Sequence, residues 1–459
     1  PMGNTRVAWP MSSQKLKHLE TPPMKAMLTR LGPAQLAGMR PAGFGARPGF
    51  VLDTVNSCWF SDGMSEGAAS GSPGNLLDLI RRRSPITRAE LVSTTGLARS
   101  TISQRVDYLI SQGFVGEVGE AVSTGGRPPT MLGFNAGSGI VLVADLGATH
   151  SRIAVCDLEA TPLAEACRDV DIANGPDIVL SWVLETFEKL TVEAGRSARD
   201  VRAIGIGVPG PVDFAAGRAI HPPIMPGWDD YPIRDRFEER YHIPVLIDND
   251  VNIMALGEYW VMQPQVEDLI FVKVGTGIGS GLIVGGHLQR GARGAAGDIG
   301  HIQAGSASVI CRCGNPACLE ASAGGAAIAR ELRAKGYETA GSRDVVALAQ
   351  AGNRDAIKAV REAGRLIGSV LAATVNLLNP AVISIGGDVA EAGQQLLAGI
   401  RETVYQRSTA LSTSELQIIT GALGDRAGII GAAALVIEHI FDPDRIDVAL
   451  VTADNGGNP

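Results

Sequence analysis

The sequence predicts an α/β protein with a small helix-turn-helix head followed by a body of two α/β lobes. Three observations predict this class: a helix-turn-helix pattern at 75–135, three strands that each end in a glycine-rich turn, and a length of 459 residues, enough for about three domains. Hydrophobic residues make up 45% of the chain and charged residues 19%, so sizeable cores can form and wholesale disorder is excluded. No run of 18 uncharged apolar residues occurs, which argues against a membrane span.

The pattern divides the chain into a head at 64–135, a first lobe at 136–255 and a second lobe at 256–426. A helix at 427–441 is expected to complete the first lobe. Residues 1–63 lack sustained periodicity, and we expect a disordered tail or a spurious extension from a start codon placed too early; a functional arm is the alternative. The six cysteines are too scattered for a disulfide framework, which indicates a reducing cytoplasm.

The head pattern begins with a helix at 75–83 and a second at 87–94, which opens with a Thr-x-x-Glu capping box. In the third helix, at 99–111, apolar residues recur at helical spacing and form one buried face. The open face carries hydroxyls, an amide and guanidinium groups, which suit base edges and phosphates in a major groove. The alternative is a three-helix connector with an exposed polar helix. The candidate DNA-binding residues are Arg99, Ser100, Thr101, Ser103, Gln104, Arg105 and, in the wing, Arg127.

The charge of the chain limits how it can meet nucleic acid. The net charge of −8 argues against a protein that coats DNA along its whole length. The segment 64–135 is close to neutral, with seven arginines against six acidic residues. We therefore expect DNA binding that depends strongly on salt and on a dimer that contacts two half-sites.

Three strands of the body, at 139–146, 269–274 and 381–385, each end in a glycine-rich turn, and the second of these turns is expected to span 275–281. Backbone N–H groups, a hydroxyl and a carboxylate at such turns can hold a phosphate and Mg²⁺. Each turn alone is also typical of an ordinary hairpin, but three in one chain predict two similar halves facing a nucleotide cleft. The candidate nucleotide-binding residues are Asp145, Gly147, Thr149, Gly275, Thr276, Gly277 and Gly386.

A buried strand at 243–248 runs into the polar pair Asn249 and Asp250, just before a helix expected at 253–260. A carboxylate at this place can accept the proton of a sugar hydroxyl that attacks a γ-phosphate, and Asn249 can bind neighbouring hydroxyls. The alternative is structural, because Asp250 could simply cap the helix.

The sharpest local pattern is a cysteine cluster with one histidine upstream. Its spacing, with glycine and proline between the cysteines, suits a tetrahedral Cys₃His zinc site. Four closed ligands imply a structural Zn²⁺ and argue against a zinc hydrolase; the alternative is three core cysteines and an unrelated histidine. Asp298 and Glu320 flank the cluster and could bind vicinal sugar hydroxyls or remain solvated loop charges. The candidate metal ligands are His301, Cys311, Cys313 and Cys318.

Together these residues resemble the ROK family of bacterial repressors and sugar kinases over about 75–445. The resemblance implies a two-lobed, actin-like ATPase or sugar-kinase-like fold behind a winged helix-turn-helix. It also implies that the turn 145–149 holds phosphate and that Asn249 and Asp250 bind sugar, with Asp250 as the catalytic base in kinases. His301 would serve zinc with one ring nitrogen and a sugar hydroxyl with the other.

The stretches 294–301 and 311–320 look like the sugar and zinc segments of the family, in which Glu320 would contact sugar. Three positions depart from the kinase pattern. Ala148 stands where kinases usually have glycine, so a Cβ crowds the phosphate approach. Asp298 stands where glutamate is usual, and Pro226 where a sugar-contacting asparagine often precedes Gly-Trp.

The combined interpretation is a sugar-responsive transcriptional regulator, a repressor of carbohydrate metabolism genes. It would act in the bacterial cytoplasm as a homodimer or homotetramer, and would be nucleoid-associated when bound to operator DNA. The expected effector is a monosaccharide or a sugar phosphate. The alternative is an ATP-dependent, glucokinase-like sugar kinase with ATP and Mg²⁺, in which Asp250 is the base and the head is accessory. The candidate sugar-binding residues are Asn249, Asp250, Asp298, His301 and Glu320.

Overall fold

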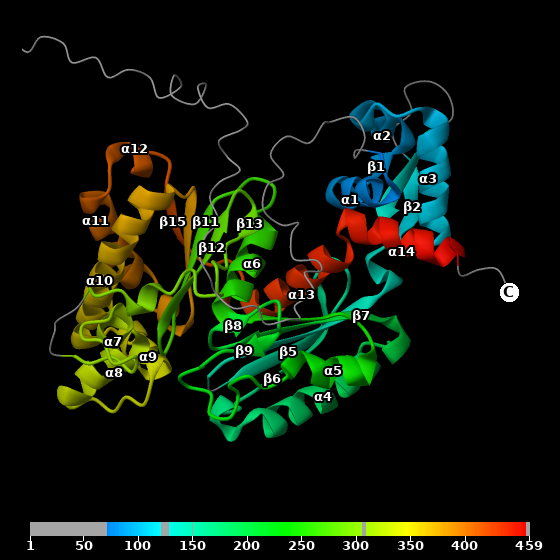
Figure 1. The fold of residues 1–459 in the computed structure, drawn as a ribbon. Coiled ribbons are helices and arrows are strands. Elements are labelled where there is room, and N and C mark those ends of the chain that lie inside the picture. The colour runs from blue at the N-terminus through cyan, green and yellow to red at the C-terminus, as the bar shows by residue number, and fades with distance from the viewer. Residues whose placement is uncertain (1–70, 121–127, 149, 305–308, 456–459) are drawn as a thin grey trace, which may run out of the picture. The chain divides into compact units, whose positions relative to one another are not determined.

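The structure, a computed structural model, describes residues 71–120, 128–148, 150–304 and 309–455. Contacts divide the chain into Pro1–Met64 and Ser65–Pro459, and every described residue belongs to the second unit (Figure 1). The predicted tail at 1–63 and two candidate site residues, Arg127 and Thr149, lie outside the described residues. Within the described ranges, no helix combines the length and apolarity that a bilayer span requires.

The head contains the three predicted helices, and the third spans the predicted residues. The capping box expected at the start of α2 is present: the Thr87 amide donates to Glu90 Oε2 (2.8 Å) and the Glu90 amide donates to Thr87 Oγ1 (3.2 Å). Three short strands form an antiparallel sheet in the order β1-β3-β2. The head elements are α1 (Pro73–Arg83), β1 (Ile86–Thr87), α2 (Arg88–Thr95), α3 (Arg99–Ser111), β2 (Val115–Glu120) and β3 (Thr130–Phe134).

A helix from the far end of the chain, α14 (Pro443–Asn455), packs on α1, as Figure 1 shows in red against blue. The Gly74 amide of α1 donates to Asp447 Oδ1 at 2.8 Å. Just before α14, the Phe441 ring meets Phe114 and Phe134 of the head edge-on. The sequence pattern placed no element here, so the head has a C-terminal part that we did not predict.

The first body sheet has five strands in the order β10-β7-β4-β5-β6. The first three run parallel, and the last two continue as antiparallel hairpins. Helix α4 (Pro176–Glu193) contacts β5 and β6, whereas α13 (Ala427–Ile440) contacts β4 and β7. The strands are β4 (Ile140–Leu146), β5 (Ser151–Cys156), β6 (Pro162–Arg168), β7 (Val201–Val208) and β10 (Val245–Asn249), with a separate pair β8 (Val212–Asp213) and β9 (Arg218–Ala219).

The second body sheet repeats this topology in the order β15-β14-β11-β12-β13. Again three parallel strands are followed by two antiparallel ones, so the prediction of two similar α/β halves is confirmed. Residues 278–281, which we predicted to lie in a turn, belong to β12, because they pair with β11. The strands are β11 (Leu269–Val274), β12 (Ile278–Val284), β13 (His287–Leu288), β14 (Val382–Gly386) and β15 (Gln417–Thr420).

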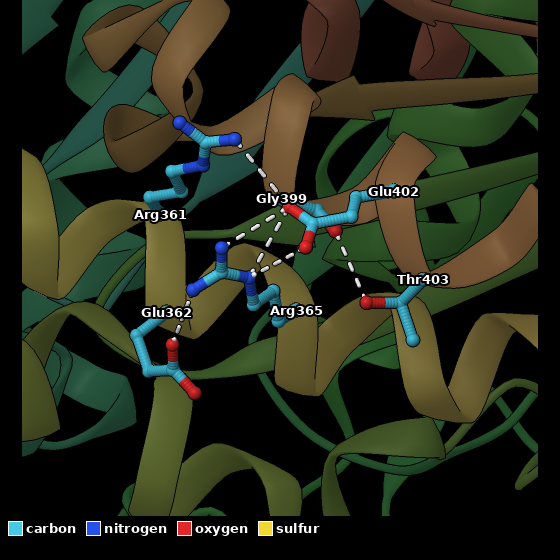
Figure 2. A network of polar contacts seen from close by, with 6 residues as sticks. All are labelled: Arg361, Glu362, Arg365, Gly399, Glu402 and Thr403. Atoms are coloured by element: carbon cyan, nitrogen blue, oxygen red, sulfur yellow. Dashed lines mark hydrogen bonds and ion pairs between the residues drawn. The ribbon is translucent and has the colours of Figure 1, made fainter. Parts of the chain in front are cut away.

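Helices α10 (Arg354–Leu378) and α11 (Gln394–Arg407) pack closely beside the second sheet. Figure 2 shows the polar contacts between them: Arg365 and Arg361 both bind Glu402, at 3.2 and 3.4 Å. These pairs are partly exposed, so each contributes little to stability. The remaining helices are α5 (Ile233–Tyr241), α7 (Leu319–Ala323), α8 (Gly325–Ala334), α9 (Ser342–Gln350) and α12 (Ala410–Thr413).

Helix α6 (Asp250–Met262) packs against α13, and both helices contact strands of the first sheet. Two glycines allow this close approach. A Cβ at Gly431 would overlap the Ile253 carbonyl oxygen, and one at Gly257 would overlap the Ala427 carbonyl oxygen. The backbones of α6 and α13 therefore lie in direct contact, and a movement of one helix is felt by the other.

Candidate functional site

A cavity of about 740 Å³ is lined by residues of both body sheets. It brings together most of the predicted sugar, nucleotide and metal residues, although these are far apart in the sequence. Cys318 is buried behind the cavity wall, and Thr149 lies outside the described residues. The predicted residues that line the cavity are Asp145, Gly147, Asn249, Asp250, Gly275, Thr276, Gly277, Asp298, His301, Cys311, Cys313, Glu320 and Gly386.

Asp145 is the last residue but one of β4, and its carboxylate lies against the first turn of α13, at Gly428. Its Oδ1 atom is buried and has no hydrogen-bond partner among the described residues. Burial raises the pKa of Asp145 to about 6; the Lys273 ammonium opposes the rise and the Asp250 carboxylate adds to it. An unsatisfied buried carboxylate oxygen is costly, so the site is suited to a cation or to a hydroxyl donor.

The structure separates the roles of Asn249 and Asp250. Asn249 is the cap of α6: its Oδ1 accepts from the Val251 amide (2.9 Å) and the Asn252 amide (3.3 Å), while Nδ2 donates to the Gly210 carbonyl (3.0 Å). The alternative in which Asp250 caps the helix is therefore wrong, because Asp250 is already the first helical residue. The Asn249 side chain is largely engaged with the backbone, whereas Asp250 can accept further hydrogen bonds.

Lys273, which the sequence reasoning missed, binds Asp250 directly. Its Nζ lies 2.6 Å from Asp250 Oδ2, and the Asp250 side chain is 7% exposed. Burial alone would lower the pKa of Lys273, but the carboxylates of Asp250, Asp145 and Asp388 outweigh it and raise that pKa. The available signal was a single charged residue inside an otherwise apolar strand.

A second ion pair joins the same strand end to the other half of the body. Arg290, which follows β13, donates from Nε to Asp248 Oδ2 at 2.7 Å, and Asp248 is 2% exposed. The Arg290 guanidinium also lies 3.9 Å from the centre of the Phe214 ring. The end of β10 and the start of α6 are therefore tied to the second half through Asp248 and Asp250 respectively.

Three further predicted sugar-binding side chains line the cavity, namely Asp298, His301 and Glu320. His301 Nε2 lies 4.0 Å from Asp298 Oδ1. Glu320 Oε2 accepts from the Ile278 amide at 3.2 Å, and it lies directly against Gly277. The Glu320 carboxylate therefore occupies the backbone amide of Ile278 beside the glycine-rich turn, an amide that could otherwise bind a phosphate. Carboxylates and imidazole so arranged can bind the hydroxyls of a polyol.

The histidine and the three cysteines form a compact donor set. Their ligand atoms all lie within 4.8 Å of one another. His301 Nδ1 is 3.6 Å from Cys311 Sγ, and Cys313 Sγ is 3.6 Å from Cys318 Sγ. Metal–sulfur bonds of about 2.3 Å give tetrahedron edges of about 3.8 Å, so the four donors fit a tetrahedral metal ion. The alternative of unrelated core cysteines does not account for this convergence.

The described candidate DNA-binding residues lie on α3, and none of them lines the cavity. Arg99, Ser100 and Gln104 are exposed, whereas Thr101 and Ser103 are half-buried. Arg105 is less open than we predicted, because its guanidinium folds back toward Gly71 and Leu97. Its Nη1 atom is buried without a hydrogen-bond partner among the described residues.

Comparison with known proteins agrees with this architecture. The xylose repressor of Bacillus subtilis is 30% identical over 368 residues, which cover 80% of this chain and 95% of the repressor. The crystal structure of a ROK family transcriptional regulator, a homologue of the E. coli MLC protein, superposes with a TM-score of 0.70 at 26% identity, covering 81% of this chain and 96% of that one. A Streptomyces griseus ROK glucokinase, solved with glucose and AMPPNP, gives a TM-score of 0.56 at 28% identity, covering 65% of this chain and 99% of the kinase.

The family model of these proteins also matches this sequence. The match spans residues 141–439, which is more than half of the chain and includes both body sheets. The chain belongs to the ROK family.

Proposed function

We propose that this chain is a DNA-binding repressor of sugar metabolism genes, and that its effector is a sugar or sugar phosphate bound in the cavity. The extent of the similarity supports a regulator over a kinase. The xylose repressor aligns over 80% of this chain, whereas the Streptomyces griseus glucokinase covers 65%. The difference between these two covered lengths is close to the length of the helix-turn-helix head. A kinase does not need such a head.

The observation that carries the proposal is the position of α6. Its first turn contains Asp250 and lines the cavity, and its last turn contains Trp260. The Arg81 guanidinium of head helix α1 lies 5.8 Å from the centre of the Trp260 ring. A helix of 13 residues is about 20 Å long, so one rigid element joins the sugar site to the head.

Helix α13 reinforces this connection. Glu438, near its end, binds Arg81 Nη2 at 2.7 Å, and the Arg81 side chain is only 8% exposed. Since α13 packs backbone to backbone on α6, a sugar that shifts α6 also shifts the residues of both helices that contact Arg81 of the head. In a dimer, such a shift moves two recognition helices away from the spacing of the half-sites. A sugar that binds the DNA-incompetent state tenfold more tightly than the DNA-competent state shifts the equilibrium between the two states by about 1.4 kcal/mol.

In this proposal the Cys₃His cluster holds a structural Zn²⁺. Cys318 directly precedes α7, the short helix that carries Glu320. A closed metal site fixes that loop and, with it, the position of the Glu320 carboxylate in the cavity. His301 would use Nδ1 for the metal and leave Nε2 for a sugar hydroxyl.

The proposal is tested by DNA binding. Sequences selected from a random duplex pool by the full chain should converge on a two-fold symmetric site. One uncharged sugar or sugar phosphate from a panel should lower the affinity at least tenfold in fluorescence anisotropy. Glu438→Gln is expected to keep the affinity for DNA and the affinity for the sugar, but to reduce the effect of the sugar on DNA binding. A pool that yields no preferred sequence, with and without sugars, would refute the proposal.

A sugar kinase is the second candidate, favoured by the unsatisfied Asp145 oxygen, which is suited to a Mg²⁺–nucleotide complex. In that case Asp250 would accept the proton of the attacking hydroxyl, and ATP would supply the phosphoryl group. A coupled ADP assay over the same sugars decides the matter. Turnover at about 1 per second or faster that is lost in Asp250→Asn would establish the kinase.

A further inference from the structure

We propose that the ion pair of Lys273 with Asp250 determines the specificity of the cavity: Lys273 orients the Asp250 carboxylate for a hydroxyl of an uncharged sugar, and the surplus of carboxylates around the pair disfavours a sugar phosphate. This inference rests on the proposed function and names the chemical class of its effector. It depends on three observations: the ion pair at the cavity floor, the equivalent positions of Lys273 and Asp145, and the excess of carboxylates around a single ammonium group.

The ion pair fixes the Asp250 carboxylate in one orientation. Oδ2 accepts from Lys273 Nζ (2.6 Å) and Oδ1 accepts from the Val251 amide (2.9 Å). Each carboxylate oxygen has two lone pairs, so each retains one for a ligand. A pair of acceptors held in this way suits the hydroxyls of a sugar, which donate, and offers nothing to a phosphate, which also accepts.

Lys273 and Asp145 occupy equivalent positions in the two halves of the body. Each is the last residue but one of the central strand, β11 and β4 respectively. Each lies opposite a glycine on the neighbouring parallel strand: Asp145 opposite Gly207, and Lys273 opposite Gly386. The repeated topology therefore presents a carboxylate from one half and an ammonium group from the other to the same cavity.

Lys273 has no side chain directly across from it on either neighbouring strand of the second sheet. Its partners across both adjacent strands are glycines, Gly279 and Gly386. The butyl chain can thus extend from β11 to Asp250 at the start of α6. The ammonium group binds Asp250 and also acts on Asp145, where it opposes the rise in pKa that burial causes.

The local charge disfavours a further anion. The ammonium of Lys273 already lies in the field of Asp145, Asp250 and Asp388. Arg152, the other cation that acts on Asp145, is paired with Asp425 (3.4 Å) and with Glu165 (3.7 Å). Arg312, Arg330 and Arg343 also line the cavity, but Lys273 is the one cation bound to Asp250 among the described residues. A phosphate group on the hydroxyl next to Asp250 would have to share that ammonium with three carboxylates, so it is repelled there.

The first test uses the unaltered full chain. Isothermal titration with xylose, glucose and N-acetylglucosamine, each beside its phosphate ester, should find one uncharged sugar that binds at least tenfold more tightly than its ester. Inorganic phosphate should not bind at the concentrations used. A phosphate ester that binds as tightly as its parent sugar, or more tightly, overturns the inference without any variant having been made.

The second test changes the charge. Lys273→Met should weaken binding of the preferred sugar at least tenfold, and Lys273→Arg should retain more of it, because it retains the charge. The matched control is Lys335→Met, which breaks another lysine ion pair, with Glu331 at 2.8 Å, outside the cavity. Lys273→Met with unchanged sugar affinity overturns the inference. If Lys273→Met does not fold, Lys273→Gln, which keeps a hydrogen-bond donor, takes its place with the same expected loss.

Operator affinity without sugar separates this inference from the proposed function. A parent chain that selects no DNA but still prefers an uncharged sugar refutes the repressor and retains the role of Lys273. A chain that binds DNA but prefers a phosphate ester refutes the role of Lys273 and retains the repressor.

Discussion

Replacing Asp145 by asparagine should stabilise the protein at neutral pH and have no effect in acid. Burial raises the pKa of Asp145 from an ordinary value of 3.8 to about 6, so the folded state holds its proton more tightly than the unfolded chain does. A raised carboxyl pKa contributes stability that is complete below pH 4 and is lost as the pH rises through 6. A shift of about 2 units corresponds to about 3 kcal/mol at pH 8.

Asp145→Asn mimics the protonated carboxyl at every pH. The free energy of unfolding in urea should therefore be higher than in the parent chain by up to about 3 kcal/mol at pH 8, with the difference vanishing near pH 4. The control is Asp425→Asn, whose side chain is 67% exposed and should change stability by less than about 0.5 kcal/mol throughout. A variant that is less stable at pH 8, or a difference that does not vary with pH, would refute the reasoning.

Four further changes test other parts of the structure. Gly431→Ala should lower the free energy of unfolding by about 2 kcal/mol or more in urea, because its Cβ meets the Ile253 carbonyl, and a loss below 0.5 kcal/mol would contradict the close helix contact. Cys313→Ser should abolish stoichiometric metal in elemental analysis and lower the melting temperature; full retention of metal would exclude Cys313 as a ligand. Arg99→Ala should weaken operator binding and reduce the slope of affinity against salt by about one unit, and an unchanged slope would remove it from the phosphate contacts. Glu438→Gln should reduce the effect of sugar on operator affinity to below threefold, with sugar affinity itself unchanged by titration; a normal effect would show that the head is coupled by another route.

Local pattern was sufficient to predict individual elements. The recognition-like helix α3 and strand β11 span the residues that the pattern indicated, because capping residues and apolar periodicity act over a few positions. The metal cluster was equally accessible, since three of its four donors lie within eight residues. These features depend on neighbours in the chain, and the sequence displays such neighbours directly.

The features that were missed depend on contacts between distant segments. Nothing near Lys273 indicates a partner 23 residues away at the start of helix α6. A capping residue also cannot be distinguished from its neighbour until the backbone turn is known. Asn249 and Asp250 are both good caps, and only the structure shows which one precedes the helix. The docking of α14 on α1 joins residues 373 positions apart, beyond any local signal.

That docking has a consequence for the order in which the protein is made. The ribosome synthesises α1 and the rest of the head early, but Phe441 and α14, which cover its surface, emerge only after the whole body. A nascent chain therefore carries an unfinished head with an exposed apolar face for most of its synthesis. The packing of the head is therefore completed only in chains that have been translated through the body and have brought α14 back onto α1.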